Sequence, residues 1–373
     1  MCMYNFDGEN FLSIKNNFKE NETVRSKLLY GKRINDCQMS IVIPTYLRNL
    51  FLERTINSAL NQNTNIKYEV IVVDNDSDFD HTATLELIKN IPSERLSYYK
   101  NEKNLGMFGN WNRCLELANS QWVLILHDDD TIDKNYISEM MQVIVRQPNL
   151  GCLGCLLNII DENNVVVEEE KKHSPNKFLS LLKKRAYSEV RVEDFYFSHP
   201  INIMGLLVNR KKAIEIGGFD SRWHPTSDFI FILNMAYRYR AGLCHKKLLN
   251  YRIAVNASMS FQHIVGMVEV DAIMRRDINK RIHVLDPRLD RKYRNYYANY
   301  MEHYCLEKWA ENLDKFERRK VVNEYKKFNK KMEFTTPPPV AFRCFKIFDK
   351  GYRFYCKYLR KNRPQIHKNS AKL

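Results

Sequence analysis

Between residues 39 and 147 the chain alternates short β-branched apolar runs with segments of helical periodicity, and this alternation most constrains its fold. The runs that predict strands are 39–46, 68–74, 95–101 and 121–127. The segments that predict helices are 49–62, about 80–90, 107–120 and 134–147. The first helical segment has Leu50, Leu52, Ile56, Ala59 and Leu60 at helical spacing. Short connections between strands and helices predict an α/β fold, a mostly parallel sheet covered by helices on both faces.

The alternation ends near residue 150, and the rest of the chain divides by pattern and charge. We predict a hairpin over 152–170, then a strand, a short helix and a Gly-Gly stop over 203–220, and a helix over 226–242 capped by Thr226 or Ser227. Residues 275–373 carry a net charge of +16, whereas the first 274 residues sum to −1. The expected units are a helical lead-in at 1–38, an α/β domain at 39–257, a helical extension at 258–336 and a basic tail at 337–373.

The composition excludes several classes of protein. Hydrophobic residues make up 44% and charged residues 28%, which is typical of globular domains and unlike disordered, collagenous or disulfide-scaffold proteins. No apolar window predicts a transmembrane helix, and the first residues lack the pattern of a signal peptide. The nine scattered cysteines therefore indicate reduced thiols in the cytoplasm. Cys152 and Cys155 have the spacing of a metal or redox pair, but without a second pair or a nearby His we expect a buried strand.

Polar side chains follow the predicted strands at the edge where ligands bind in parallel α/β sheets. They are Thr45, the run Asp74-Asn75-Asp76-Ser77, Asn104, and the run His127-Asp128-Asp129-Asp130. Three adjacent carboxylates repel one another, so their packing favours a bound cation. Hard cations such as Mg²⁺ take carboxylate oxygens together with substrate phosphates. The alternatives are an acidic turn that caps the next helix and, for Asp74 and Asp76, an Asx turn.

The segments SIVIPTY, VIVVDNDSD, KNLG and LILHDDDTI resemble, in order and spacing, the nucleotide-binding half of family 2 glycosyltransferases, which have the GT-A fold. The resemblance covers about residues 39–255 and implies a nucleotide-binding half at 39–150 and an acceptor half at 151–257. It implies a divalent cation, Mn²⁺ or Mg²⁺, held by Asp129 and Asp130. The nucleotide-sugar contacts that it implies are Pro44, Thr45, Tyr46, Arg48, Asp74, Asn75, Asp76, Asn104, Gly106 and, toward the donor ribose, Asp128.

The family's catalytic base is an Asp on a helix that follows a G-G-F-D segment, here residues 217–220. The matching acid is Asp228, and Ser227 replaces the usual preceding acid. A carboxylate within hydrogen-bond reach can take the proton of an attacking sugar hydroxyl. The alternative is an acid that only favours the helix dipole. Trp223 and His224 are candidates for the acceptor pocket, with a core position as the alternative for Trp223.

Two departures from the family pattern affect this site. His127 stands where many relatives have the first acid of the metal motif, and Ala254 replaces a His of the family's Y-R-x-H segment. Arg252 is then either a phosphate partner or a surface arginine. The resemblance implies transfer with inversion from a nucleotide-diphosphate sugar, and we expect a UDP-linked donor. Processive relatives carry a Q-x-x-R-W motif and transmembrane helices; neither is found here, so we expect one sugar per encounter.

The segment 340–361 has the period of a basic amphipathic helix. Its basic positions are Arg343, Lys346, Lys350, Arg353, Lys357 and Arg360, and its apolar face has Phe345, Phe348, Tyr352, Tyr355 and Leu359. Such helices bind anionic membrane surfaces; a helix docked on the core is the alternative. No nucleic-acid reading motif accompanies the charge, so we expect no nucleic-acid partner.

Together with the resemblance, this helix suggests an enzyme peripheral at the cytoplasmic face of the inner membrane. Its acceptor would be a saccharide or a lipid-linked saccharide of O-antigen or capsule assembly. A catalytically inactive GT-A-like scaffold at the membrane surface is the alternative. Nucleotidyl transfer and P-loop chemistry are disfavoured, because no Gly-rich phosphate loop follows the first strand.

Overall fold

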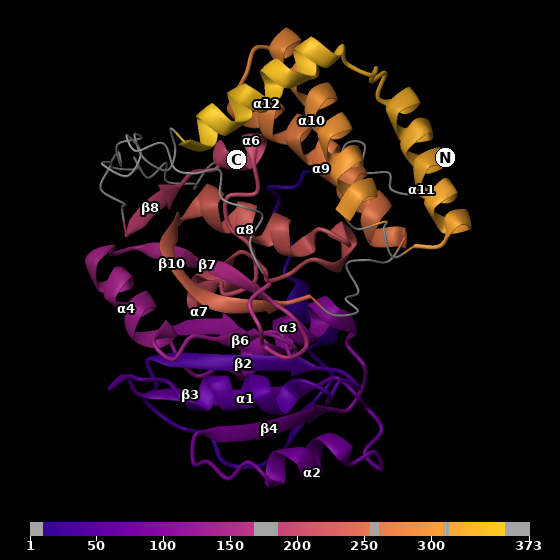
Figure 1. The fold of residues 1–373 in the computed structure, drawn as a ribbon. Coiled ribbons are helices and arrows are strands. Elements are labelled where there is room, and N and C mark those ends of the chain that lie inside the picture. The colour runs from indigo at the N-terminus through magenta and orange to yellow at the C-terminus, as the bar shows by residue number, and fades with distance from the viewer. Residues whose placement is uncertain (1–9, 168–185, 254–260, 309, 311–312, 355–373) are drawn as a thin grey trace.

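The computed structural model describes residues 10–167, 186–253, 261–308, 310 and 313–354. These residues contain a ten-stranded mixed sheet in the order β1-β4-β3-β2-β5-β9-β7-β10-β6, with β8 paired to β10 (Figure 1). The strands are β1 Ser26–Tyr30, β2 Met39–Thr45, β3 Tyr68–Asp74, β4 Leu96–Asn101, β5 Trp122–Ile125, β6 Thr131–Ile132, β7 Leu150–Ile160, β8 Tyr187–Val190, β9 Leu207–Asn209 and β10 Arg240–Arg252. The predicted α/β class is confirmed.

The four strands predicted from the alternation lie side by side as β4, β3, β2 and β5, and all are parallel. Thr45 pairs with Asp74, and Asp74 pairs with Lys100, so these strands end at one edge of the sheet. Next to β5 the direction reverses, because β9 is antiparallel to both β5 and β7. The acidic run follows β5 directly, so it lies outside the carboxyl end of a parallel strand, which is the usual place for a ligand in such sheets.

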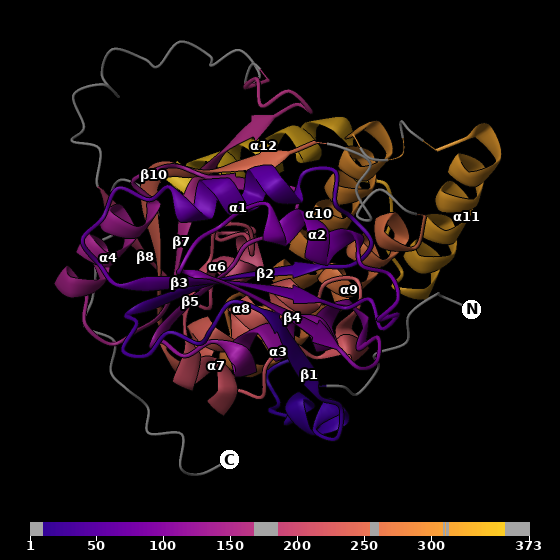
Figure 2. The same cartoon turned by 90° about the horizontal axis from the view of Figure 1, so that it is seen from below.

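Helices cover both faces of the sheet, as predicted (Figure 2). One face packs against α1 Leu52–Leu60, α2 Ala83–Lys89 and α4 Tyr136–Arg146, and the other against α3 Gly106–Leu117, α7 Arg210–Glu215 and α8 Ser227–Arg238. The prediction for Leu50 was wrong: α1 begins only at Leu52, and Leu50 is 82% exposed. Helical spacing alone could not show that the turn after β2 delays the start of the helix.

The N-terminal segment is not the helical lead-in that we predicted. Its described part contains a short 3₁₀ helix, Asn17–Asn21, and the edge strand β1, which pairs antiparallel with β4. The buried Arg113 of α3 holds this segment: its guanidinium donates to the Ser26 hydroxyl and to the carbonyls of Asn21 and Val24. These contacts join residues about 90 positions apart, so no local pattern announces them.

The acceptor half follows the predicted order with one difference. β7 buries Cys152 and Cys155, as expected, and burial raises the pKa of both thiols to about 12. A turn after β7 begins the predicted hairpin, with Val167 N bonded to Ile159 O; its continuation over 168–170 lies outside the described residues. The helix predicted over 226–242 is α8, but it ends at Arg238, and β10 begins at Arg240.

The C-terminal helices pack against the acceptor half, at the top of Figure 1. They are α9 Phe261–Ile282, α10 Pro287–Lys308, α11 Lys315–Lys331 and α12 Pro339–Phe354. The long helix α9 also contacts the short α6, Asp194–Phe197. The Tyr325 hydroxyl of α11 donates to the Ile264 carbonyl of α9. Apolar residues of the extension belong to the same buried core as those of α6 and α8. None of the helices in the described ranges is both long and apolar enough to cross a membrane.

Candidate active site

The structure brings the polar ends of β2 and β5 together. The Thr45 hydroxyl, at the end of β2, donates to Asp128 Oδ2 at 2.8 Å. The Thr55 hydroxyl of α1 lies 3.0 Å from the Asp128 carbonyl and 2.8 Å from the Asp130 carbonyl, and so fixes the turn after β5. Sequence reasoning missed Thr55, since a threonine inside a helical pattern carries no signal of this contact. The turn is therefore held from two elements, with its side chains gathered in one cluster.

The three acids of this turn are all buried. Burial and the neighbouring Asp129 raise the pKa of Asp128 to about 6, although Arg48 opposes the shift. The same two causes raise the pKa of Asp130 well above its usual range. Buried, mutually repelling carboxylates are costly unless positive charge accompanies them. Arg48 supplies part of that charge, with Nη2 at 2.7 Å from Asp129 Oδ2 and Nη1 at 3.5 Å from Asp128 Oδ1.

His127, Asp129 and Asp130 could hold a metal ion, because one ligand atom of each lies within 4.8 Å of the others. Asp130 Oδ2 and His127 Nε2 are buried without a hydrogen-bond partner, and Asp130 Oδ2 lies 3.7 Å from the other ring nitrogen, His127 Nδ1. Burial also lowers the pKa of His127, which favours the neutral imidazole that binds metals. A cation bound to Asp130 Oδ2 would offset the buried negative charge there, so the residues fit a divalent ion. His127, which the sequence presented as a departure from the motif, belongs to this candidate set.

Arg252 is not a surface arginine: its side chain is fully buried. Its backbone N–H donates to Asp130 Oδ1 at 2.9 Å, and its Nε donates to the Asp129 carbonyl at 2.8 Å. The guanidinium also donates to the Asp161 carbonyl and to Asn164 Oδ1. Arg252 therefore ties the acidic turn to β10 and to the turn after β7. Ala254, the second departure from the family pattern, lies outside the described residues.

The turn after β3 is a dense hydrogen-bond network. Asp74 accepts from the Tyr98 hydroxyl at 2.7 Å and from its own turn at Asp76 N, and Asp76 pairs with the buried Lys100. Asn75 Nδ2 donates to Asn104 Oδ1 and to the Gly106 carbonyl, which joins this turn to the start of α3. The Asx-turn alternative is thus realised at Asp74 and Asp76. Tyr98 and Lys100, both inside β4, were missed because strand residues carry no motif.

Other predicted donor contacts lie around the end of β2. Pro44 is buried within β2, and Tyr46 is exposed just after it. Leu47 follows with a φ of +52°, a left-handed conformation that costs roughly 1–2 kcal/mol for a residue with a side chain. The reversal at Leu47 precedes Arg48, whose guanidinium meets the acidic cluster. The strained turn therefore places the positively charged Arg48 guanidinium next to the acidic cluster.

Asp228, the candidate base, lies in the first turn of α8 and is partly buried. Burial raises its pKa, whereas the Phe229 backbone N–H and the charge of His199 act in the opposite direction. The neighbouring Ser227 is buried, and its hydroxyl has no hydrogen-bond partner. Thr226 marks the predicted start of α8, but its hydroxyl bonds back to the Trp223 carbonyl and does not cap the helix.

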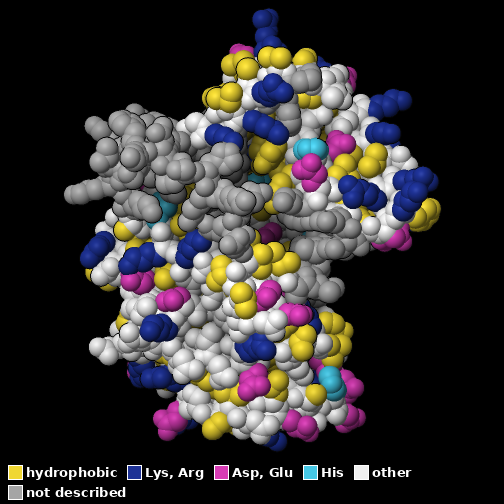
Figure 3. All heavy atoms as spheres, viewed as in Figure 1, with side chains coloured by type: hydrophobic (Ala, Val, Ile, Leu, Met, Phe, Trp, Pro, Cys, Tyr) yellow, Lys and Arg dark blue, Asp and Glu magenta, His cyan; other side chains and the backbone are white. Residues whose placement is uncertain are grey.

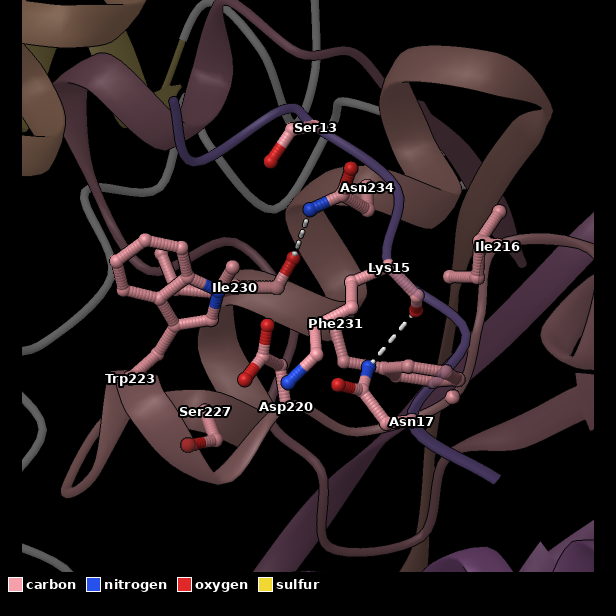
Figure 4. A pocket seen from close by; sticks show the side chains of 11 residues that line it. Ser13, Lys15, Asn17, Ile216, Asp220, Trp223, Ser227, Ile230, Phe231 and Asn234 are labelled. Carbon is pink, nitrogen blue, oxygen red and sulfur yellow. Dashed lines mark hydrogen bonds between the residues drawn. The ribbon is translucent and has the colours of Figure 1, made fainter. Parts of the chain in front are cut away.

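Trp223 belongs to the core, the alternative that the sequence left open. It is 3% exposed, and its ring centroid is 4.6 Å from that of Phe11. Trp223 also borders a cavity of about 20 Å³ between the N-terminal segment and α8, and Asn234 lines the same cavity (Figure 4). That volume holds about one water molecule and no sugar. His224 is half-buried, with its ring between Phe108 and His263.

An aromatic chain connects the acidic cluster to the start of α8. The His127 ring stacks on Trp111 with centroids 5.2 Å apart, and Trp111 meets Phe108 edge to face at 5.3 Å. Phe108 in turn contacts His224, four residues before Asp228. Residues of α3 therefore link the acidic cluster, through successive ring contacts, to the loop that precedes Asp228.

The fold and this site define a GT-A-type nucleotide-sugar transferase. Residues 40–215 match the family model described as glycosyl transferase family 2, so this part of the chain is a family 2 glycosyltransferase domain. It is 23% identical over 249 residues to the GalNAc(5)-diNAcBac-PP-undecaprenol beta-1,3-glucosyltransferase of Campylobacter jejuni, covering 65% of this chain and 75% of that protein. It is 28% identical over 113 residues to the abequosyltransferase RfbV of Salmonella typhimurium, covering 30% and 34% of the two chains.

A crystal structure of S. aureus TarS 1-349 in complex with UDP-GlcNAc has a similar fold. The TM-score is 0.53 at 16% sequence identity, and the match covers 87% of this chain and 94% of that one. The likeness extends beyond the family-model match and therefore includes helices of the C-terminal extension. The predicted family and fold are confirmed by these comparisons.

Proposed function

We propose that this protein transfers a single sugar, with inversion, from a UDP-linked donor to a hydroxyl of a lipid-linked or growing surface polysaccharide. The observation that carries the proposal is the cluster of Thr45, Arg48 and the acidic turn 127–130, joined by α3 to the helix of Asp228. The Campylobacter relative is named for action on an undecaprenol-linked saccharide, and RfbV for transfer of abequose. Both names support an acceptor of this class.

In the proposed reaction, the acceptor oxygen attacks the anomeric carbon from the side opposite the diphosphate. The new C–O bond forms as the bond to the diphosphate breaks, and the electron pair leaves with UDP. Asp228 takes the proton of the acceptor hydroxyl, which makes that oxygen a better nucleophile. His127, Asp129 and Asp130 would hold a divalent cation, which when bound stabilises negative charge on the diphosphate. Thr45 holds Asp128 in position for the donor, and Arg48 is close enough to the cluster to bind a phosphate oxygen.

The test of this function is a calorimetric titration of UDP into the protein, first with Mn²⁺ and then with EDTA. We expect UDP to bind with Mn²⁺ and to bind at least about tenfold more weakly with EDTA, because a cation would shield the diphosphate from the buried acids. Titrations with dTDP and GDP serve as matched controls for the identity of the nucleobase. Equal affinity in both conditions would contradict metal dependence, and preference for another nucleotide would contradict a UDP donor.

We also propose that helix α12 binds the membrane surface that carries a lipid-linked acceptor. Part of its predicted aromatic face is docked: Phe345 is buried, and Phe345 and Phe348 both contact Tyr293 of α10. The other side of α12 is exposed, with Val340 and Ile347 more than 70% accessible. The exposed basic residues beside them are Arg343, Lys346 and Lys350. Figure 3 shows Lys and Arg side chains scattered among apolar ones over this end of the molecule.

Flotation with liposomes tests this membrane surface. Replacing Arg343 and Lys350 by glutamine should weaken binding to anionic vesicles by about 2 kcal/mol, roughly 30-fold in the partition coefficient, since each basic residue contributes about 1 kcal/mol. The matched control replaces Lys89 and Arg146, exposed on α2 and α4, by glutamine. Equal loss in both double variants would indicate a nonspecific effect of net charge. Unchanged binding of the α12 variant would contradict the proposed membrane surface.

The alternative of an inactive scaffold loses part of its basis. It depended on His127 and Ala254 as departures from the family pattern. His127 lies in the candidate ligand set, and Ala254 lies outside the described residues. We therefore retain the enzyme as the proposed function.

A further inference from the structure

We infer that residues 10–17, the first described segment of the chain, position helix α8 and with it Asp228, and that one buried water molecule joins Asn17 of this segment to Ser227 of the helix. The inference rests on the proposed function of Asp228. It extends that function to a segment outside the residues matched by the family model. Asn17 and Ser227 are then positioning residues, because they act on the reaction through Asp228.

Segment 10–17 lies along α8 and is bonded to it at several points. The Arg238 guanidinium, in the last turn of α8, donates to the Leu12 carbonyl. Asn234 Nδ2, one turn earlier, donates to the Phe11 carbonyl at 2.7 Å. The fully buried Phe11 ring lies 4.6 Å from the ring of Trp223, just before α8. The helix therefore cannot shift along the segment without breaking buried contacts.

The segment is itself anchored on two sides. The Phe11 backbone N–H donates to Asp277 Oδ2 on α9 at 3.2 Å. At the other end, the Asn17 backbone N–H and Nδ2 both donate to the Gly217 carbonyl, at 3.1 and 3.0 Å. The fit there is tight, because a Cβ on Gly217 would lie 1.8 Å from the Lys15 carbonyl oxygen. Segment 10–17 thus joins the helical extension to the Gly-Gly turn that leads into α8.

The hydrogen bonds of Asn17 fix the orientation of its amide. Nδ2 donates to the carbonyls of Lys15 and Gly217, at 3.0 Å each. A flipped amide would place its oxygen against two carbonyl oxygens, so the observed orientation is the favourable one. Asn17 Oδ1 is then left for another donor, and it is buried without a partner among the described residues. The same holds for the hydroxyl of Ser227, which is 1% exposed.

Asn17 and Ser227 line the same cavity of about 20 Å³ between segment 10–17 and α8 (Figure 4). A water molecule needs roughly 10–15 Å³ of such volume and polar partners around it. Asp220 also lines the cavity, but its carboxylate is paired with Arg222. The Ser227 hydroxyl donates to the water oxygen, and a water O–H donates to Asn17 Oδ1. One water thus satisfies both buried groups, which a dry cavity would leave unpaired.

This water would restrain the turn that carries the base. The first turn of α8 has no side-chain cap among the described residues, whereas the later turns are bonded to segment 10–17. Asp228 follows Ser227 directly in that first turn. A base acts only within hydrogen-bond reach of the proton that it takes. A displacement of about 1 Å can cost roughly 100-fold in rate.

A high-resolution crystal structure of the full chain tests the water site without any substrate. We expect one ordered water within about 2.5–3.0 Å of both Asn17 Oδ1 and Ser227 Oγ. The same water should be absent or displaced in Ser227→Ala. A wild-type cavity without this water, or a water that contacts only one of the two atoms, would overturn the inference. This outcome does not depend on the folding of any variant.

The positioning role is tested by separating rate from donor binding. Ser227→Ala should lower the maximal rate of UDP release about tenfold and leave calorimetric UDP affinity unchanged. The donors are UDP-glucose, UDP-galactose, UDP-GlcNAc and UDP-GalNAc together, with a membrane extract as acceptor. The matched control is Ser138→Ala in the first turn of α4, where the hydroxyl bonds within its own turn to the Asn135 carbonyl. The control should keep the wild-type rate; an equal rate in Ser227→Ala would overturn the role.

A double variant tests whether both side chains act through one water. Asn17→Ala combined with Ser227→Ala should lose no more rate, and no more thermal stability, than the worse single variant, because either change breaks the same bridge. Losses that multiply in the double variant would contradict the shared water. A failure of the proposed base would look different. The ordered water and the coupled unfolding midpoints would persist, but Asp228→Asn would retain full transfer activity.

Discussion

Replacing Asp228 by asparagine is expected to lower the rate of sugar transfer by about 10²–10⁴-fold, the range associated with loss of a general base. Asparagine keeps the size of the side chain but cannot accept the acceptor's proton. The proposed donor site lies around β2 and β5, so UDP affinity should change little. Initial rates of UDP release in the presence of a membrane-extract acceptor, together with calorimetric UDP affinity, measure the two effects.

The pH dependence follows from the same carboxylate. Burial raises the pKa of Asp228, and the base acts only when ionised. Activity should therefore be present above that raised pKa and be lost as the pH falls through it, at a higher pH than for an ordinary aspartate. Asp314→Asn is the matched control, because Asp314 caps the distant helix α11 and asparagine is an equally good cap. Transfer by Asp228→Asn at the wild-type rate would contradict the assignment.

Replacing Asp129 by asparagine is expected to weaken both Mn²⁺ binding and Mn²⁺-dependent UDP binding by about 100-fold or more. Loss of even an outer-shell partner of a metal costs 10–100-fold, and Asp129 is a candidate direct ligand. UDP affinity in EDTA should be unaffected or slightly improved, since one acid near the diphosphate has lost its charge. Calorimetry of Mn²⁺ and of UDP measures these changes.

The ligand set has its own spectroscopic check. Bound Mn²⁺ should show ¹⁴N modulation in pulsed EPR if the His127 imidazole coordinates it, and His127→Asn should remove that signal. Asp133→Asn is the matched control, because Asp133 follows the same turn and does not belong to the set. Wild-type Mn²⁺ affinity in Asp129→Asn, or a ¹⁴N signal that survives in His127→Asn, would contradict the proposed ligands.

Much of the structure of residues 39–150 could be predicted, because the sequence signals there are local. The strands β2, β3, β4 and β5 are continuous apolar runs, and parallel pairing brings their ends to one edge whatever the rest of the chain does. The acidic run after β5 was recognisable for the same reason, since three adjacent carboxylates need no partner from elsewhere to be noticed. Gly217 was predicted as a stop, and the structure shows why: its φ is +88°, and a Cβ there would meet the Lys15 carbonyl at 1.8 Å.

The predictions that failed concern contacts between distant parts of the chain. The lead-in was expected to be helical, but β1 pairs with a strand about 70 residues later. Arg252 was left open between a phosphate partner and a surface residue, and the surface alternative was wrong, because its side chain is fully buried and bonded to the acidic turn. For α12 the sequence left open a membrane-binding or a docked helix, and Phe345 is docked against α10 whereas Ile347 is exposed. In each case the residue type and spacing are compatible with the expected arrangement as well as with the observed one.

The sequence by itself determined the α/β class, the family, the position of the acidic turn and the identity of the candidate base. Periodicity and residue order suffice for these, because each depends on neighbours along the chain. Only the tertiary structure decided that His127 lies in the candidate metal-ligand set, that Thr55 and Arg252 hold the turn, and that Asp271 orients His199. The residues joined by the Thr55, Arg252 and Asp271 contacts are 72 or more positions apart in the sequence. The role of His127 depends on which atoms burial leaves without a hydrogen-bond partner. Burial and pairing are properties of the packed molecule, so no local pattern encodes them.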